Sequence, residues 1–99
     1  MSEPAVTQSE LEWCARQWAM IRDGGVWGIP RSGLILVKRE ASRTFAVTAR
    51  MPLMPGMVTF EGEPLTAEQL REQQDAEIAG LRARFERVGI QVVDETEDA

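Results

Sequence analysis

The chain has 99 residues, a formal net charge of −5, one cysteine and no histidine. This length favours one domain, and the hydrophobic share of 43% is ordinary for a globular protein. The missing histidine excludes Ser-His and Cys-His nucleophiles, and the sequence has no Walker loop or dinucleotide fingerprint. We therefore expect a protein that is not an enzyme and that holds no cofactor and no metal.

The first elements in chain order are a polar start and a helix. Residues 1–7 are expected to be flexible, and they lack the apolar region of a signal peptide. Thr7 with Glu10 is a capping-box pattern, and Gly24 or Gly25 is expected to cap the other end of the helix. An apolar stripe follows at helical spacing: Leu11, Cys14, Trp18 and Ile21. Cys14 lies in this stripe, so we expect a buried, unreactive thiol.

Three extended segments come next. "VWGIP" is expected at a sheet edge because of Pro30, and "GLILVKRE" and "RTFAVTARM" form a hairpin joined by the polar "EAS". Strand alternation divides the last segment between two faces. We expect Phe45, Val47 and Ala49 on one face, and Thr44, Ala46, Thr48 and Arg50 on the other.

A proline-rich loop, "MPLMPGMVTFEGEP", leads to a second helix, and "MVTF" could pair briefly within the loop. Thr66 with Gln69 is a second capping box, and the helix should run to about Val88. Its apolar seam is Ala67, Leu70, Gln74, Ile78, Leu81, Phe85 and Val88. Gln74 either sets the register of a helix pair or lies half-exposed. The small residues Ala76 and Gly80 suggest close approach of another backbone.

The chain then has a short strand, "GIQVV", and an acidic segment, residues 94–99, which we expect to be a disordered tail. The single domain is expected to span residues 8–93. The predicted fold class is α+β, with a small antiparallel sheet of three to four strands and two helices packed on one face.

Charge is unevenly distributed along the sequence. The segment 31–50 has five basic residues and one acid, so its formal charge is +4 and the remainder of the chain carries −9. The acidic remainder argues against binding to duplex nucleic acid. The basic hairpin could meet an anion or acidic surface, or dock on an acidic face of another copy. Alternatively, its arginines are simply solvated.

The stretch "DGGVWGIPRSG" predicts a β-turn that presents Arg31 and Ser32 beside Trp27. A guanidinium, a hydroxyl and an indole suit a phosphate attached to a base, and they also suit a protein interface. A third interpretation is a tight turn whose tryptophan completes the core. The candidate ligand-binding residues are Trp27, Arg31, Ser32, Lys38, Arg39, Arg43 and Arg50.

The runs "DGGVWGIPRSGL", "RMPLMP" and "EQQDAEIAGLRARFERVGIQVVDE" resemble small uncharacterised accessory proteins of tailed bacteriophages. The resemblance implies a protein that acts by binding in the host. No apolar run approaches the roughly 20 residues that cross a bilayer, and a lone cysteine fits a reducing compartment, so we expect the host cytoplasm and no membrane. The leading hypothesis is a homo-oligomer, paired through helix 66–88, that sequesters a nucleotide-type signal of host defence. The alternatives are an inhibitor or adaptor that binds a host protein, and a virion structural or assembly protein.

Overall fold

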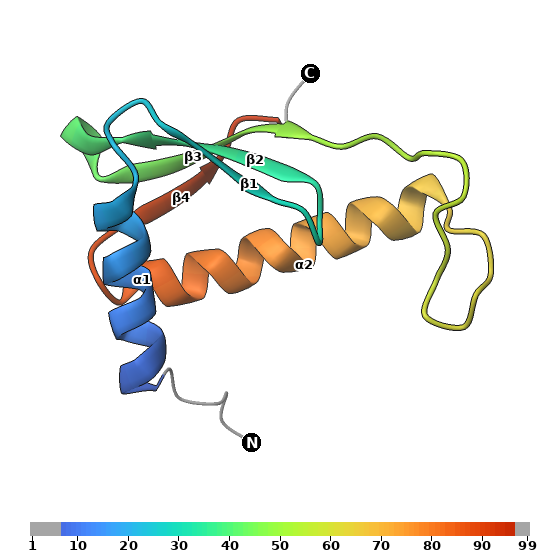
Figure 1. Ribbon diagram of the computed structural model, residues 1–99, viewed down its shortest axis with the longest axis horizontal. Helices are drawn as coiled ribbons and strands as arrows, with labels where there is room; N and C mark the ends of the chain where they lie inside the picture. The colour runs from blue at the N-terminus through green and yellow to red at the C-terminus, as the bar shows by residue number, and fades with distance from the viewer. Residues whose placement is uncertain (1–6, 97–99) are drawn as a thin grey trace.

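The computed structural model describes residues 7–96 as two helices and a four-stranded sheet (Figure 1). In chain order the elements are α1 (Gln8–Met20), β1 (Val26–Ile29), β2 (Leu34–Arg39), the 3-10 turn η1 (Glu40–Ser42), β3 (Thr44–Arg50), α2 (Ala67–Glu86) and β4 (Gln91–Asp94). The α+β fold class is confirmed. The expected flexible start, residues 1–6, and the end of the acidic tail, residues 97–99, lie outside the described residues.

The sheet is mixed, with strand order β1-β2-β3-β4. β1 pairs with β2, and β2 with β3, in the expected antiparallel sense, whereas β4 pairs with β3 in parallel. A helix that crosses one face of a sheet returns the next strand parallel to the previous one. α2 is such a crossover, so the expectation of an antiparallel sheet is wrong for the last strand.

Both helices lie on one face of the sheet, with α2 along it and α1 across one end (Figure 1). The core between the two layers draws its buried residues from both helices and from β2, β3 and β4. These residues are Cys14, Trp18, Leu34, Leu36, Phe45, Val47, Ile78, Leu81, Phe85, Ile90 and Val92. Trp27 and Ile29 of β1 pack against its edge.

α1 begins as the sequence predicts. Glu10 N donates to Thr7 Oγ1 at 3.1 Å, and Thr7 N donates to Glu10 Oε1 at 3.1 Å, which completes the capping box. The expected glycine cap is wrong, because the helix ends at Met20 and Gly24, with φ of +79°, lies in a later turn. A different residue therefore has to satisfy the last carbonyl groups of α1.

α2 begins at the expected capping box and ends at Glu86. The seam is buried from Leu70 to Phe85 and contributes Ile78, Leu81 and Phe85 to the core of the same chain, whereas Ala67 is exposed. Gln74 has neither of its expected roles: it is 3% exposed, and its Nε2 donates to the carbonyl oxygens of Ser32 at 3.1 Å and Met51 at 3.0 Å. Self-association through helix 66–88 remains a prediction, and within this helix the exposed residues beside the seam, such as Gln73 and Ala76, are the ones available for it.

A bulge changes the expected facing of β3. The pairing with β2 shifts by one residue at Thr48. Before the bulge, Phe45 and Val47 face the core as expected; after it, Arg50 faces the helices and Ala49 faces away. The predicted alternation is wrong beyond Thr48, because one extra residue reverses the sides of those that follow.

The sheet also extends into the expected tail. Asp94 is the last residue of β4, and Glu95 N donates to Val47 O at 2.9 Å. Arginines hold both acids: Arg50 contacts Asp94, and Arg39 contacts Glu95. Disorder is therefore the wrong expectation for residues 94 and 95, since their charges have partners on β2 and β3.

Candidate functional site

The segment 29–33 forms the turn between β1 and β2. Gly33, with φ of +75°, donates its N–H to Ile29 O at 2.8 Å, and Ser32 N donates to the same oxygen at 3.3 Å. Arg31 is exposed, as expected, whereas Ser32 is only 5% exposed. The hydrogen bond from Gln74 to Ser32 O fastens this turn to α2.

The turn and α2 border a groove of about 400 Å³, which we call the Arg31 groove. Its lining residues are Arg31, Ser32, Gln73, Ala76, Glu77, Gly80 and Arg84. Arg31 Nη2 contacts both carboxylate oxygens of Glu77, at 3.1 and 3.3 Å. Arg84 Nε donates to Glu10 Oε2 on α1 at 3.2 Å. Ser32 Oγ is buried and has no hydrogen-bond partner among residues 7–96.

Gly80 leaves the floor of the Arg31 groove open. A Cβ atom at this position would meet Arg84 Nη1 at 4.0 Å, which is open space for a side chain. Within the described part of the chain, no backbone makes the close approach expected at Gly80, and Ala76 is exposed. Neither the packing nor the backbone conformation of this chain therefore requires the glycine.

Lys38 is buried among helix carbonyl groups. Its Nζ donates to the carbonyl oxygens of Trp18 and Ile21, each at 2.7 Å, and lies 4.4 Å from the centroid of the Trp18 ring. These acceptors stand at the C-terminus of α1, where carbonyl groups lack helical partners and a cation is favoured. Lys38 therefore caps α1 in place of the expected glycine.

Arg43 binds the turn that follows α2. Its Nε donates to Gly89 O at 3.1 Å, and its Nη2 donates to Val88 O at 3.2 Å. Arg39 is partly exposed and forms a forked ion pair with Glu95, in which Nη2 lies 2.8 Å from Oε1. Neither arginine lines the Arg31 groove.

Arg50 is buried between the sheet and α2. Its Nη2 donates to Asp94 Oδ2 at 2.5 Å and its Nε to Thr96 Oγ1 at 2.8 Å. Its Nη1 lies 2.9 Å from Asp75 Oδ1, an ion pair without hydrogen-bond alignment. Burial would raise the pKa of Asp94, but hydrogen bonds from Thr96 and Arg50 outweigh it, so this pKa lies below its ordinary value. Arg50 thus joins β3, β4 and α2.

Trp27 packs at the edge of the core. Its ring centroid lies 5.2 Å from Phe45, 5.8 Å from Phe85 and 5.9 Å from Trp13. Tilted and edge-to-face arrangements at these distances are favourable for aromatic pairs. This placement agrees with the interpretation in which Trp27 completes the core.

The structure thus brings Arg31 and Ser32 into one groove and distributes the other five candidates. Each cation of the basic segment contacts a carboxylate or a backbone carbonyl of the same chain. Sequence reasoning missed Glu77 and Arg84. The available signal was a second 3/4-spaced face of the helix, at 73, 77, 80 and 84, beside the apolar seam.

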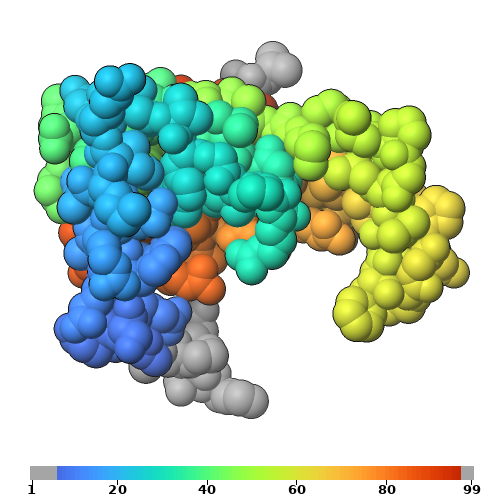
Figure 2. All heavy atoms as spheres, in the orientation of Figure 1, coloured from blue at the N-terminus to red at the C-terminus, as the bar shows by residue number. Residues whose placement is uncertain are grey.

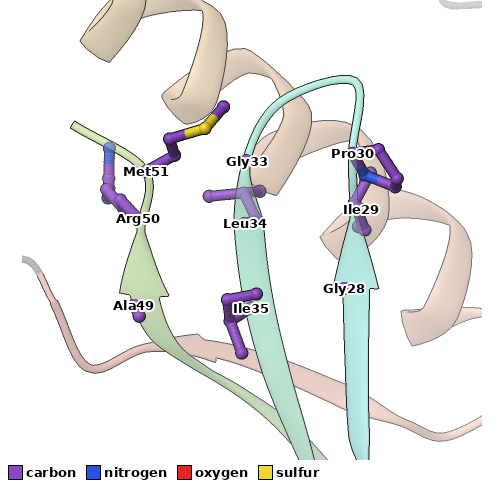
Figure 3. A pocket seen from close by; sticks show the side chains of 9 residues that line it. All are labelled: Gly28, Ile29, Pro30, Gly33, Leu34, Ile35, Ala49, Arg50 and Met51. Atoms are coloured by element: carbon purple, nitrogen blue, oxygen red, sulfur yellow. The ribbon is translucent and has the colours of Figure 1, made fainter. Parts of the chain in front are cut away.

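The sheet face opposite the helices, which we call the open face, is largely apolar. Its members follow from the strand register: the apolar ones are Val26, Gly28, Ile35, Val37, Ala46, Ala49 and Val93, and the polar ones, at the end next to η1, are Arg39, Thr44 and Gln91. At one end it is hollowed into an apolar pocket of about 480 Å³, seen in Figure 3 with α2 behind the strands. The bulge in β3 places Ala49 here, and Pro30, Gly33 and Met51 also line the pocket.

Residues 52–66 form an arm that extends beyond the end of the sheet (Figure 1). The yellow part of this arm stands clear of the body in Figure 2. Internal hydrogen bonds order it: Thr59 N donates to Glu63 O at 2.7 Å, and Gly62 N donates to Thr59 O at 2.9 Å. Four large apolar side chains of the arm are exposed: Leu53 (40%), Met54 (50%), Val58 (56%) and Phe60, which is fully exposed.

Reactive groups are scarce among residues 7–96. Cys14 is fully buried, and burial raises the pKa of its thiol. In this part of the chain, no three His, Cys, Asp or Glu side chains lie close enough to hold a metal ion. Neither helix there has the length and apolarity needed to cross a membrane.

Comparison with known proteins gives no relative from which a role could be taken. The chain matches no protein-family model, and no curated protein or solved structure is significantly similar to it.

Proposed function

We propose that this protein acts by binding another polypeptide through the arm and the open face, and not by catalysis. The observation that carries this proposal is Phe60, a fully exposed aromatic side chain on an ordered arm. Aromatic side chains are enriched at protein interfaces, where they anchor binding by filling pockets on the partner.

Two further features support the proposal. Exposed apolar side chains scattered singly are ordinary, whereas four in one short arm indicate an interaction site. The hydrogen bonds within the arm fix its backbone before binding, and such preorganisation lowers the entropy lost on association. The resemblance to phage accessory proteins makes the host cytoplasm the compartment in which we propose that the partner is met.

The experiment compares capture of binding partners by the wild-type chain and by two serine variants. Phe60→Ser removes the arm's anchor, and Met20→Ser removes a 74% exposed side chain of α1 as the matched control. A polypeptide retained by wild type and Met20→Ser, and lost with Phe60→Ser, supports the proposal. Equal retention by all three chains contradicts it.

A second candidate function is capture of an anionic small molecule, such as the nucleotide-type signal named above, in the Arg31 groove. The specific observation in its favour is the buried Ser32 Oγ, which has no hydrogen-bond partner among residues 7–96 and lines the same groove as Arg31 and Arg84. A phosphate or carboxylate accepts hydrogen bonds from a hydroxyl and from guanidinium groups. Glu77 and Glu10 already occupy these arginines, so the ligand has to displace a carboxylate.

Mass spectrometry of small molecules released from the purified, denatured protein tests this candidate. An anionic compound carried by wild type and absent from Arg31→Ala would support it. Arg39→Ala is the control, because Arg39 is also an exposed arginine in an ion pair but lies outside the groove. A compound carried equally by both variants argues against the groove.

A further inference from the structure

The arm carries an exposed aromatic side chain, and the pocket is lined mainly by apolar residues, none of which belongs to the arm residues 52–66. Phe60 is fully exposed, and the pocket holds about 480 Å³ of apolar space, enough for a benzyl group. We infer that the binding partner is a second copy of this chain, and that each copy inserts Phe60 into the apolar pocket of the other. This inference rests on the proposed function and names its partner.

The positions of the inserted side chain and of the pocket that receives it favour a dimer with two-fold symmetry. Met51 lines the apolar pocket, and the arm begins at the next residue, so both partners of the contact belong to one continuous surface. In a two-fold interface the same patch of each copy meets itself, with residue i on j and j on i. The arm starts beside the pocket of its own chain, so the arm and the pocket of one copy can meet the pocket and the arm of the other.

Charge adds a second complementarity. Glu61 follows Phe60 at the tip of the arm, and Arg31 follows Pro30 at the rim of the pocket. The side chain of Arg31 is 79% exposed even though it contacts Glu77, so its remaining donors face solvent. The guanidinium of Arg31 lies on Glu77 of α2, so Glu61 of an incoming arm meets this cation when Arg31 exchanges Glu77 for it.

The two phenylalanines supply only part of the area that a stable dimer buries. A buried phenylalanine removes about 150–250 Å² of surface, so two of them contribute about 300–500 Å². Stable interfaces bury about 1,200–2,000 Å² in total. The exposed Leu53, Met54 and Val58 of two arms, with the open face of each copy, supply apolar surface for the remainder.

Sedimentation velocity of the purified chain tests the exchange. We expect wild type and Met20→Ser to form dimers, and Phe60→Ser and Ala49→Glu to be monomers with unchanged melting temperatures. Ala49 faces solvent on the open face, so its replacement places the charge in the pocket and not in the core. A monomeric wild type overturns the inference, as does a dimer that survives either Phe60→Ser or Ala49→Glu.

Cysteine cross-linking provides an independent test that keeps Phe60 and Ala49 in place. A Glu61→Cys chain mixed with a Met51→Cys chain should form a mixed disulfide on mild oxidation, and Cys14 is buried. Replacing Met51→Cys by Met20→Cys is the control. Failure of the first pair, or equal cross-linking of the control pair, contradicts the exchange.

The two proposals fail differently. A wild-type chain that is monomeric when pure, yet captures a different protein through Phe60, leaves the proposed function standing and overturns the second copy as its partner. Phe60→Ser without effect on either measurement contradicts both.

Discussion

The basic segment 31–50 and the arm 52–66 are neighbours in sequence, but they differ in how many of their side chains contact the rest of the chain. The first has a formal charge of +4, and its five cations contact carboxylates or carbonyl groups of the same chain. The second has four large apolar side chains that remain exposed. The surplus positive charge of the basic segment is therefore used in contacts within the chain, whereas the arm supplies the apolar surface that remains exposed.

The difference follows from the length of the side chains and from the place of each segment in the fold. Long cationic side chains extend from a strand to the end of a helix or to the next strand, so a carbonyl group or a carboxylate remote in sequence accepts their hydrogen bonds. Lys38 contacts a carbonyl group 20 residues away, and Arg50 a carboxylate 44 residues away. Residues 52–66 extend beyond the end of the sheet (Figure 1), and Leu53, Met54 and Phe60 of this arm are exposed.

The largest expected effect tests whether partners within the chain hold the cations of the basic segment. Asp94→Asn should lower the free energy of unfolding by about 3 kcal/mol at pH 7, because it leaves Arg50 buried with its main partner neutralised. Urea denaturation measures the change. Asp75→Asn, at a carboxylate that is 56% exposed, should cost much less. Equal losses would show that the Arg50–Asp94 pair is not special.

The dependence of stability on pH tests the same Arg50–Asp94 pair. The pKa of Asp94 is lower in the folded protein than its ordinary value of about 3.9, so its contribution is complete above that pH and is lost as pH falls toward the folded pKa. Wild type should therefore lose stability below about pH 4 more steeply than Asp94→Asn. Denaturation midpoints between neutral pH and pH 3 provide the measurement. Parallel profiles would contradict the assignment.

Next in size is Lys38→Met. The variant removes two charge-assisted hydrogen bonds and leaves the carbonyl groups of Trp18 and Ile21 without their donor. A loss of about 2–3 kcal/mol in the free energy of unfolding is expected, with α1 the first element to gain amide hydrogen exchange. Arg39→Met is the control, since Arg39 is partly exposed and caps no helix. Unchanged exchange in α1 would show that Lys38 is not its cap.

A smaller effect is expected for Gln74→Leu. Its Nε2 donates to the carbonyl oxygens of Ser32 and Met51, which joins the β1–β2 turn to the base of the arm. Losing both donors should cost about 1–2 kcal/mol, measured by thermal unfolding. Gln73→Leu tests the same chemical change on the exposed neighbour. Equal stability of the two variants would count against a tie through Gln74.

The smallest effect on stability is expected where the effect on binding is largest. Phe60→Ser should change the free energy of unfolding by less than about 0.5 kcal/mol, because the side chain is fully exposed and supports no packing. Chemical denaturation of the monomer, at a concentration below association, measures it. A large loss would place Phe60 in the fold of its own chain, and the contrast between the two regions would disappear.

Local signals in the sequence account for most of the fold. Capping boxes at Thr7 and Thr66 set the starts of both helices, and the 3/4 spacing of Leu70, Ile78 and Phe85 identifies the buried face of α2. The strands follow from short apolar runs between turn residues. Each of these features depends on neighbours within about one helical turn or one hairpin.

The missed features depend on residues far apart in the chain. Sequence spacing does not reveal that Lys38 caps α1, that Asp94 pairs with Arg50, or that β4 runs parallel to β3. The bulge at Thr48 was equally hidden, and it is what moves Ala49 to the pocket. For the candidate site, the sequence correctly indicated the turn at Arg31, but the pocket appears only when three strands are assembled.

The parallel pairing of β4 has a consequence for the order in which the molecule assembles. β3 lies inside the sheet, yet one of its hydrogen-bonding edges stays open until residues 91–94 arrive, after the whole of α2. Contacts between such distant residues form slowly, because a long loop must close first. Until β4 has paired with β3, the edge of β3 beside Phe45 and Val47 can pair with strands of other molecules. Nascent chains that pause before β4 should thus be the species most prone to aggregate.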